Sequence, residues 1–169
     1  MDIHNFQNQF MPRSYKIKAL KRENAAMAYP LIRSAMPAIT LEDWLAYTDW
    51  HAQPTELREP STGIMTLENS RGYIHWLFSF CTSYGLGAGP VLNVDHFIAI
   101  DTGDRAVAVT RLIDAMEDLA QHNGCTVIHT HLPESWAVLT PGRKNLLAQL
   151  VNAGHGRDTV KLSKSLTTG

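Results

Sequence analysis

The sequence predicts a single α/β domain in which one sheet carries helices on both faces. Three observations lead to this expectation. The chain has 169 residues, the size of one ordinary domain. Hydrophobic residues make up 44% and charged residues 18%, a composition typical of a chain that buries a core. Strand-like and helix-like patterns follow one another in the order β-α-α-β-β-β-α-β-α-β, which favours layers of helix and sheet.

The first third of the chain predicts an arm, one strand and two helices. Residues 1–13 are rich in Asn and Gln, so we expect a flexible arm before a single domain over residues 14–169. Residues 15–20 alternate polar and apolar side chains, as a half-buried strand does. The first helix starts near Glu23 and ends at Pro37, and its apolar stripe consists of Ala26, Tyr29, Ile32 and Met36. Thr40 is a capping residue for a second helix that runs to about His51.

The middle of the chain predicts three strands. Residues 63–69 and 73–82 flank a short turn and indicate a hairpin. The glycine-rich stretch 84–89 lacks the Lys-Ser/Thr ending of a phosphate-binding loop, so we interpret it as a flexible connection. Residues 90–100 form a long apolar run, the best candidate for the centre of the sheet.

The last third predicts a helix, a strand, a second helix and a final strand. The first helix follows residues 101–104 and ends at Gly124, and its stripe consists of Val109, Leu112, Ile113, Met116, Leu119 and Ala120. Residues 125–132 are strand-like. A helix over 143–153 ends at Gly154, and residues 158–166 alternate as an edge strand would.

Charge and cysteine usage exclude several classes of partner. The formal net charge is −1, so there is no field to attract nucleic acid or an anionic membrane. No apolar run approaches the roughly 20 residues that span a bilayer, and residues 1–13 do not resemble a signal peptide. Cys81 and Cys125 lie far apart in apolar runs and are interpreted as reduced, buried thiols. We therefore expect a cytoplasmic protein.

Three segments of the chain resemble the GNAT superfamily of N-acetyltransferases. They are YKIKALKRENAAMAYPLIRSA, HFIAIDTGDRAVAVTRLIDAMEDLAQHNGCTVIHTHL and NAGHGRDTVKLSKSL, and the similarity extends over residues 15–166. The resemblance implies a mixed, largely antiparallel sheet of six or seven strands. It also implies an acyl-CoA-dependent N-acyltransferase, with acetyl-CoA as the default donor and a small-molecule or peptide amine as acceptor. Family members often pair, so a homodimer is a further expectation.

The resemblance also implies which residues hold the donor. The family signature Q/R-x-x-G-x-G/A at the start of the cofactor helix is matched by Arg105, Ala106, Val107, Ala108, Val109 and Thr110. Backbone N–H groups there would bind the pyrophosphate, and Arg105 would add charge. Alanine and threonine replace the two glycines, and the β-branched Thr110 works against close contact. In the preceding strand, the backbone at Ile98, Ala99 and Ile100 would bind the pantetheine arm and steer the acyl group.

The resemblance places His96 where many family members carry a glutamate that removes the proton of the amine. Histidine suits this role because its ordinary pKa is about 6.5. The alternative is a hydrogen-bonded histidine near the sheet surface, with Asp95 as the next candidate on the opposite face of an ideal strand. Leu150 stands where the family often has a tyrosine as general acid, and His155 replaces the phenylalanine of a Gly-Phe pair. These departures favour a second hypothesis, a non-catalytic acyl-CoA-binding or partner-binding module on the same fold.

Two further histidines, His129 and His131, lie two residues apart in a predicted strand and so share a face. Two imidazoles can begin a metal site, but the sequence supplies no third ligand at a suitable spacing, so we predict no metal. The alternatives are a polar cleft lined by both rings and simple exposure to solvent.

Overall fold

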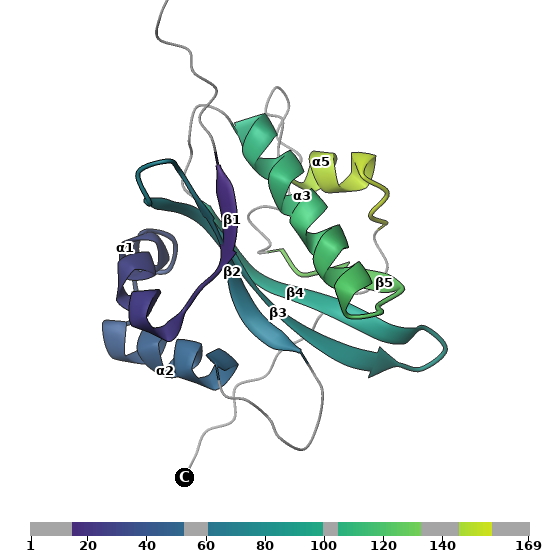
Figure 1. The fold of residues 1–169 in the computed structure, drawn as a ribbon, viewed down its shortest axis with the longest axis horizontal. Coiled ribbons are helices and arrows are strands. Elements are labelled where there is room, and N and C mark those ends of the chain that lie inside the picture. The colour runs from purple at the N-terminus through teal and green to yellow at the C-terminus, as the bar shows by residue number, and fades with distance from the viewer. Residues whose placement is uncertain (1–14, 53–60, 100–104, 133–145, 157–169) are drawn as a thin grey trace, which may run out of the picture.

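The computed structural model describes residues 15–52, 61–99, 105–132 and 146–156. The predicted arm, the predicted last strand over 158–166 and the candidate residue Ile100 lie outside these ranges. The elements, shown in Figure 1, are β1 (Lys16–Ala19), a 3₁₀ turn η1 (Arg22–Asn24), α1 (Ala25–Ala35), α2 (Leu41–Ala52), β2 (Thr62–Glu68), β3 (Ile74–Gly85), β4 (Gly89–Ala99), α3 (Arg105–His122), β5 (Val127–Thr130) and α5 (Leu146–Asn152). Apart from η1, each matches an element that the sequence predicts.

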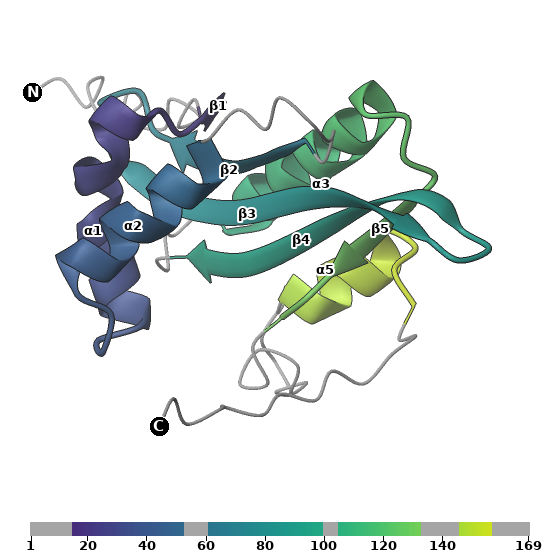
Figure 2. The same cartoon turned by 90° about the horizontal axis from the view of Figure 1, so that it is seen from below.

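The strands form one mixed sheet in the order β1-β2-β3-β4-β5. The first four strands pair antiparallel, and only β4 and β5 run parallel. The prediction of a mixed, largely antiparallel sheet is therefore confirmed. Five strands lie in the described part of the chain, so a count of six or seven is not confirmed. Helices α1 and α2 cover one face, and α3 covers the other with α5 beside it, as Figures 1 and 2 show.

The α3 side of the sheet holds the larger core. The predicted α3 stripe is confirmed, because Val109, Leu112 and Met116 are fully buried against the sheet. Aromatic side chains of β3 and β4 fill the space beneath the helix. The ring of Phe97 stacks on that of Phe78 at 6.0 Å and meets Trp76 edge-on at 5.8 Å. This packing fixes α3 over the strands that carry the candidate site.

The smaller core lies under α1 and α2. The predicted stripe of α1 is partly wrong, because Ala26 and Met36 are exposed, whereas the buried face consists of Ala25, Ala28, Leu31 and Ile32. The helix is rotated so that its first turn meets α2, where Trp44 Nε1 donates a hydrogen bond of 2.7 Å to the Ala25 carbonyl. Contact with a neighbouring helix thus decides which of two similar apolar faces is buried.

The predicted helix ends agree with the structure. Thr40 and Asp43 form a reciprocal capping box: Thr40 Oγ1 accepts the Asp43 N–H and Asp43 Oδ2 accepts the Thr40 N–H, each at 3.1 Å. The side-chain and backbone hydrogen bonds of Thr40 lower the pKa of the Asp43 carboxyl. At the other ends of two helices, Gly124 (φ 65°) and Gly154 (φ 95°) take the left-handed conformation that closes α3 and α5.

The two cysteines are unpaired, as predicted, but not fully buried. Cys81 and Cys125 are each partly exposed, because one lies on β3 beyond the cover of the helices and the other in the turn after α3. Their partial burial raises the pKa of both thiols, and the Asp95 carboxylate adds to the effect at Cys81. Within the described ranges, no helix combines the length and apolarity needed to cross a bilayer.

Candidate functional site

The strand β4 contains a bulge at the residue that the sequence proposes as catalytic. Leu77 pairs with Ile98 and Ser79 pairs with Asp95, so β4 has one residue more than β3 between these pairs. His96 has a φ of 50°, which a residue with a side chain rarely adopts. An extra residue of this kind bends a strand and changes the direction in which its side chains point.

Because of the bulge, Asp95 and His96 project on the same side of the sheet, the side of α1 and α2. Ser79 Oγ donates a 3.0 Å hydrogen bond to the Asp95 carbonyl and lies 3.2 Å from His96 Nδ1. Tyr47 of α2 places its hydroxyl 3.1 Å from the same nitrogen. The expectation that Asp95 faces away from His96 is wrong, because it assumes the strict alternation of an ideal strand.

His96 Nδ1 has two hydroxyl neighbours, Ser79 and Tyr47. Ser79 donates its proton to the Asp95 carbonyl, whereas the Tyr47 hydroxyl can donate to Nδ1 or accept from it. These contacts fit a neutral ring with the proton on Nδ1, and in that tautomer Nε2 carries the lone pair. The His96 side chain is exposed.

Next to the bulge, the pairing of the two parallel strands ends, and we call this place the parting point. The β4–β5 register runs from Val91↔Val127 to Val94↔Thr130, and one further hydrogen bond of 2.9 Å joins His131 N to Val94 O. In contrast, β4 continues to Ala99. Figure 2 shows β5 beside β4. The parting point coincides with the bulge.

A hydrogen bond between His131 and Asp95 lies at the parting point. His131 Nδ1 lies 2.7 Å from Asp95 Oδ1, and the two side chains are 35% and 27% exposed. The neighbouring Ile128 and Leu132 pack into the core on the α3 side, so His131 faces the α1–α2 side, as alternation predicts. His129 lies opposite Asn93, within the paired stretch. No group of three metal-binding side chains occurs among the described residues.

Helix α2 completes the site from above. The Tyr47 ring lies 4.5 Å from that of His51 and 5.3 Å from that of His96. His51 Nδ1 contacts Thr62 Oγ1 at 2.6 Å. Burial raises the pKa of the Tyr47 hydroxyl. The pKa of His51 is lowered, mainly by burial and to a smaller extent by the nearby His96. Six residues make up a group that we call the polar cluster: Tyr47, His51, Ser79, Asp95, His96 and His131.

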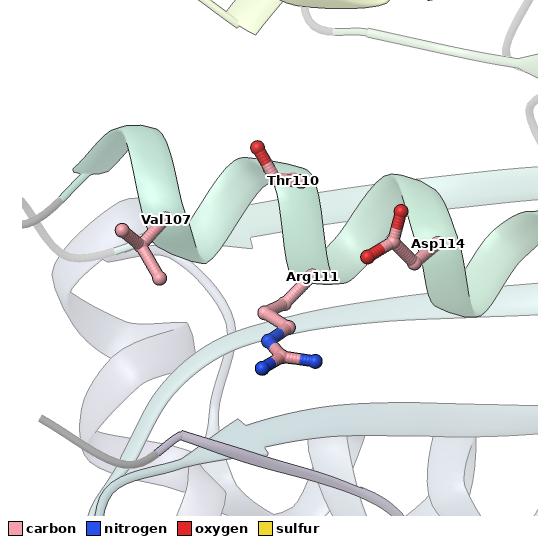
Figure 3. A pocket seen from close by; sticks show the side chains of 4 residues that line it. All are labelled: Val107, Thr110, Arg111 and Asp114. Carbon is pink, nitrogen blue, oxygen red and sulfur yellow. The ribbon is translucent and has the colours of Figure 1, made fainter. Parts of the chain in front are cut away.

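The start of α3 forms the second part of the candidate site. The side chains of Ala108 and Val109 are buried in the core, whereas Val107 and Thr110 face solvent. Figure 3 shows Val107 and Thr110 on the helix with Arg111 and Asp114, and these four residues line a shallow groove of about 370 Å³. In a helix that begins at Arg105, the first turn has N–H groups that no helical carbonyl accepts. A helix N-terminus of this kind can bind an anion.

The other predicted residues lie in β4 and α5. Ile98 is buried against α1, and Ala99 pairs with Trp76. Leu150 is 2% exposed in the α3-side core, and its carbonyl accepts a 2.9 Å hydrogen bond from His155 N. The position where the resemblance places a tyrosine is thus filled by a packed aliphatic side chain.

No family model and no curated protein matches the sequence. Solved structures do match. An acetyltransferase of Trypanosoma brucei is 13% identical, with 90% of this chain and 100% of that chain covered and a TM-score of 0.67. The aminoglycoside N-acetyltransferase AAC(6')-Iy in complex with CoA is 13% identical, with 92% of this chain and 98% of that chain covered and a TM-score of 0.66. Glucosamine-6-phosphate N-acetyltransferase from Arabidopsis thaliana is 12% identical, with 91% of this chain and 99% of that chain covered and a TM-score of 0.64. The chain has the GNAT fold.

The sequence predicts that β4 and the start of α3 belong to the site, but it does not predict that α2 packs over β4. His96 and Asp95 are identified from the sequence, whereas Tyr47, His51 and Ser79 are missed. Tyr47 and His51 are four residues apart on one helix, so their shared face is visible in the sequence. The sequence carries no signal that this face lies over β4.

Proposed function

We propose that this chain is an acyl-CoA-dependent N-acyltransferase, with acetyl-CoA as the default donor. The observation that carries the proposal is the end of β4–β5 pairing at Val94, beside a bulge that presents His96. On the GNAT fold, a gap between these strands is where the resemblance places the acyl-CoA arm. The solved structures that match include enzymes described as complexes with CoA and with a CoA bisubstrate analogue, which supports the same donor.

On the donor side, the chain offers backbone groups rather than charged side chains. The first turn of α3 would hold the pyrophosphate through its open N–H groups, with Arg105 adding positive charge. The backbone of Ile98, Ala99 and Ile100 would bind the pantetheine arm and polarise the thioester carbonyl. Of the predicted segment 105–110, the first turn supplies the donors, because later N–H groups bond within the helix.

On the acceptor side, His96 is the proposed proton acceptor. The amine nitrogen attacks the thioester carbonyl carbon, a C–N bond forms, and the amine proton passes to His96 Nε2. The C–S bond then breaks and the electron pair leaves with sulfur. The hydroxyl groups of Tyr47 and Ser79 at Nδ1 orient the imidazole for this transfer. The acceptor amine, a homodimer and a cytoplasmic location stay predictions.

One observation favours a second candidate function, a module that binds acyl-CoA or a partner without catalysis. Leu150 is buried where the GNAT resemblance implies a tyrosine that protonates the thiolate. A leucine has no proton to donate. If no other group supplies this proton, the site binds the donor but turns over poorly.

Thermal melting with acetyl-CoA tests the proposal directly. At about 100 times the dissociation constant, a ligand that binds the folded state adds about 2.7 kcal/mol. For a domain of this size we expect the melting temperature to rise by about 5–10 °C. ATP is the control, because it has phosphates but no thioester arm. No shift with acetyl-CoA, or an equal shift with ATP, contradicts both an acyltransferase and an acyl-CoA-binding module.

Turnover then separates the two candidates. Acetyl-CoA is incubated with an aminoglycoside, glucosamine 6-phosphate or a peptide with an N-terminal alanine, and released CoA is measured by chromatography. A thiol-reactive dye is unsuitable because Cys81 and Cys125 are free and partly exposed. For an enzyme, we expect His96→Gln to lower kcat by about 100-fold or more while the melting shift persists. A melting shift without CoA release from any amine favours the binding module.

A further inference from the structure

The Asp95–His131 pair offers the proton that Leu150 cannot supply. We propose that His131 is the catalytic acid that protonates the departing CoA sulfur, and that Asp95 is its positioning residue. The inference rests on the proposed acyltransferase function. It assigns to the end of β5 a role that the resemblance implies for a tyrosine near α5.

The position of His131 is the first argument. His131 is the first residue beyond the paired stretch, and its N–H still bonds to the Val94 carbonyl at 2.9 Å. From there its side chain reaches across the parting point to Asp95. A thioester bound where the β4–β5 pairing ends would meet this pair. The His131 side chain is 35% exposed, so it packs partly against the protein and is still accessible to a substrate.

The hydrogen bond is the second argument, because it fixes which ring nitrogen faces the substrate. An ionised carboxylate can only accept, so the 2.7 Å contact with Asp95 Oδ1 requires a proton on His131 Nδ1. Proton exchange then takes place at Nε2. The carboxylate also balances the positive charge when the ring is doubly protonated. A histidine oriented by a carboxylate in this way is a recurrent device for proton transfer.

The backbone around the pair is the third argument. Ser79 Oγ holds the Asp95 carbonyl at 3.0 Å, and the bulge at His96 brings Asp95 and His96 onto one side of the sheet. The site therefore contains two histidines on one side of the sheet, one on β4 and one after β5. Two such groups can divide the two proton transfers of one reaction.

The proton balance closes with this division. As the C–N bond forms, His96 takes the amine proton at Nε2. As the C–S bond breaks, His131 gives its Nε2 proton to the sulfur and CoA leaves as the thiol. At the end of a cycle His96 is protonated and His131 is neutral, and exchange with solvent restores both.

The pH profile of kcat tests the assignment. An acid must be protonated to work, so His131 produces a loss of activity at high pH, whereas the base His96 produces a loss at low pH. We expect His131→Gln to lower kcat by about 100-fold and to remove the high-pH limb, with little change in KM. Asp95→Asn is expected to lower kcat as well, because an amide no longer imposes the tautomer.

The matched control is His129→Gln. It replaces the same residue type on the same face two residues earlier, opposite Asn93 within the paired stretch. We expect it to keep the kcat and the high-pH limb of the natural chain. The other titratable groups on this face are Tyr47 and His51 of α2, Cys81 of β3 and His96 of β4. The low-pH and high-pH limbs of the His131→Gln profile are therefore also compared with those of His96→Gln. Melting curves of each variant report whether it folds.

Nitrogen NMR of the full chain provides a test that needs no acceptor. The ring nitrogen signals of His131 are assigned as those that are absent from His131→Gln. In the neutral ring we expect the proton on Nδ1, and in Asp95→Asn we expect the proton on Nε2 instead. A neutral Nε2–H ring in the natural chain overturns the proposal. So does a His131→Gln variant that keeps the high-pH limb and a kcat within about twofold of His129→Gln. If the natural chain neither binds acetyl-CoA nor releases CoA, the acyltransferase proposal itself has failed.

Discussion

A single charge placed at the start of α3 should weaken donor binding without destabilising the fold. Val107 lies in the first turn, and its side chain is 47% exposed and projects into the groove of Figure 3. In Val107→Glu, a carboxylate near the helix N-terminus stabilises the helix by about 0.3–1 kcal/mol. A pyrophosphate bound to the same turn would meet this charge at about 6 Å, where an effective dielectric of about 20 gives a repulsion of about 3 kcal/mol per charge pair.

Salt and solvent reduce this repulsion, so we expect acetyl-CoA binding to weaken by about 1–3 kcal/mol, or roughly 5–150-fold. Calorimetric titration measures the affinity, and thermal melting without ligand measures stability. Val107→Gln is the control, because it has the same length and no charge. The affinity difference between the two variants should shrink at 0.5 M salt. Equal affinity at low salt would refute a diphosphate site at this helix start.

Three other predictions concern the scaffold. Trp44→Phe should cost about 1–3 kcal/mol in chemical denaturation, because it removes the 2.7 Å bond to the Ala25 carbonyl between α1 and α2. Thr40→Ala should cost about 1 kcal/mol through loss of the cap. Thr40 lowers the pKa of Asp43, so the Asp43 carboxylate stabilises the fold at pH values above its usual pKa of about 3.9. This contribution is lost as the pH falls below that value, so the free energy of unfolding of Thr40→Ala should depend less on pH in this acidic range. Gly154→Ala should cost about 1–2 kcal/mol because of its φ of 95°, and equal stability of Gly154→Ala and the open-space control Gly156→Ala in urea would contradict this reasoning.

The described secondary structure follows largely from local patterns in the sequence. The stripe of α3, the cap at Thr40 and the glycines after α3 and α5 involve residues within a few positions of one another. Periodicity and capping report such short-range interactions, so these elements are predicted correctly. The stripe of α1 is the exception. Two faces of that helix are similarly apolar, and contact with Trp44, 19 residues away, chooses between them.

The candidate site is only half determined by the sequence. His96, Asp95 and the segment that begins α3 are identified by type and by their place in the chain. The bulge, the end of β4–β5 pairing and the hydrogen bond between Asp95 and His131 come from the tertiary structure alone. A bulge arises from the count of residues between two pairs on different strands, and no local periodicity records that count. Asp95 and His131 meet across 36 residues because strand register brings them together.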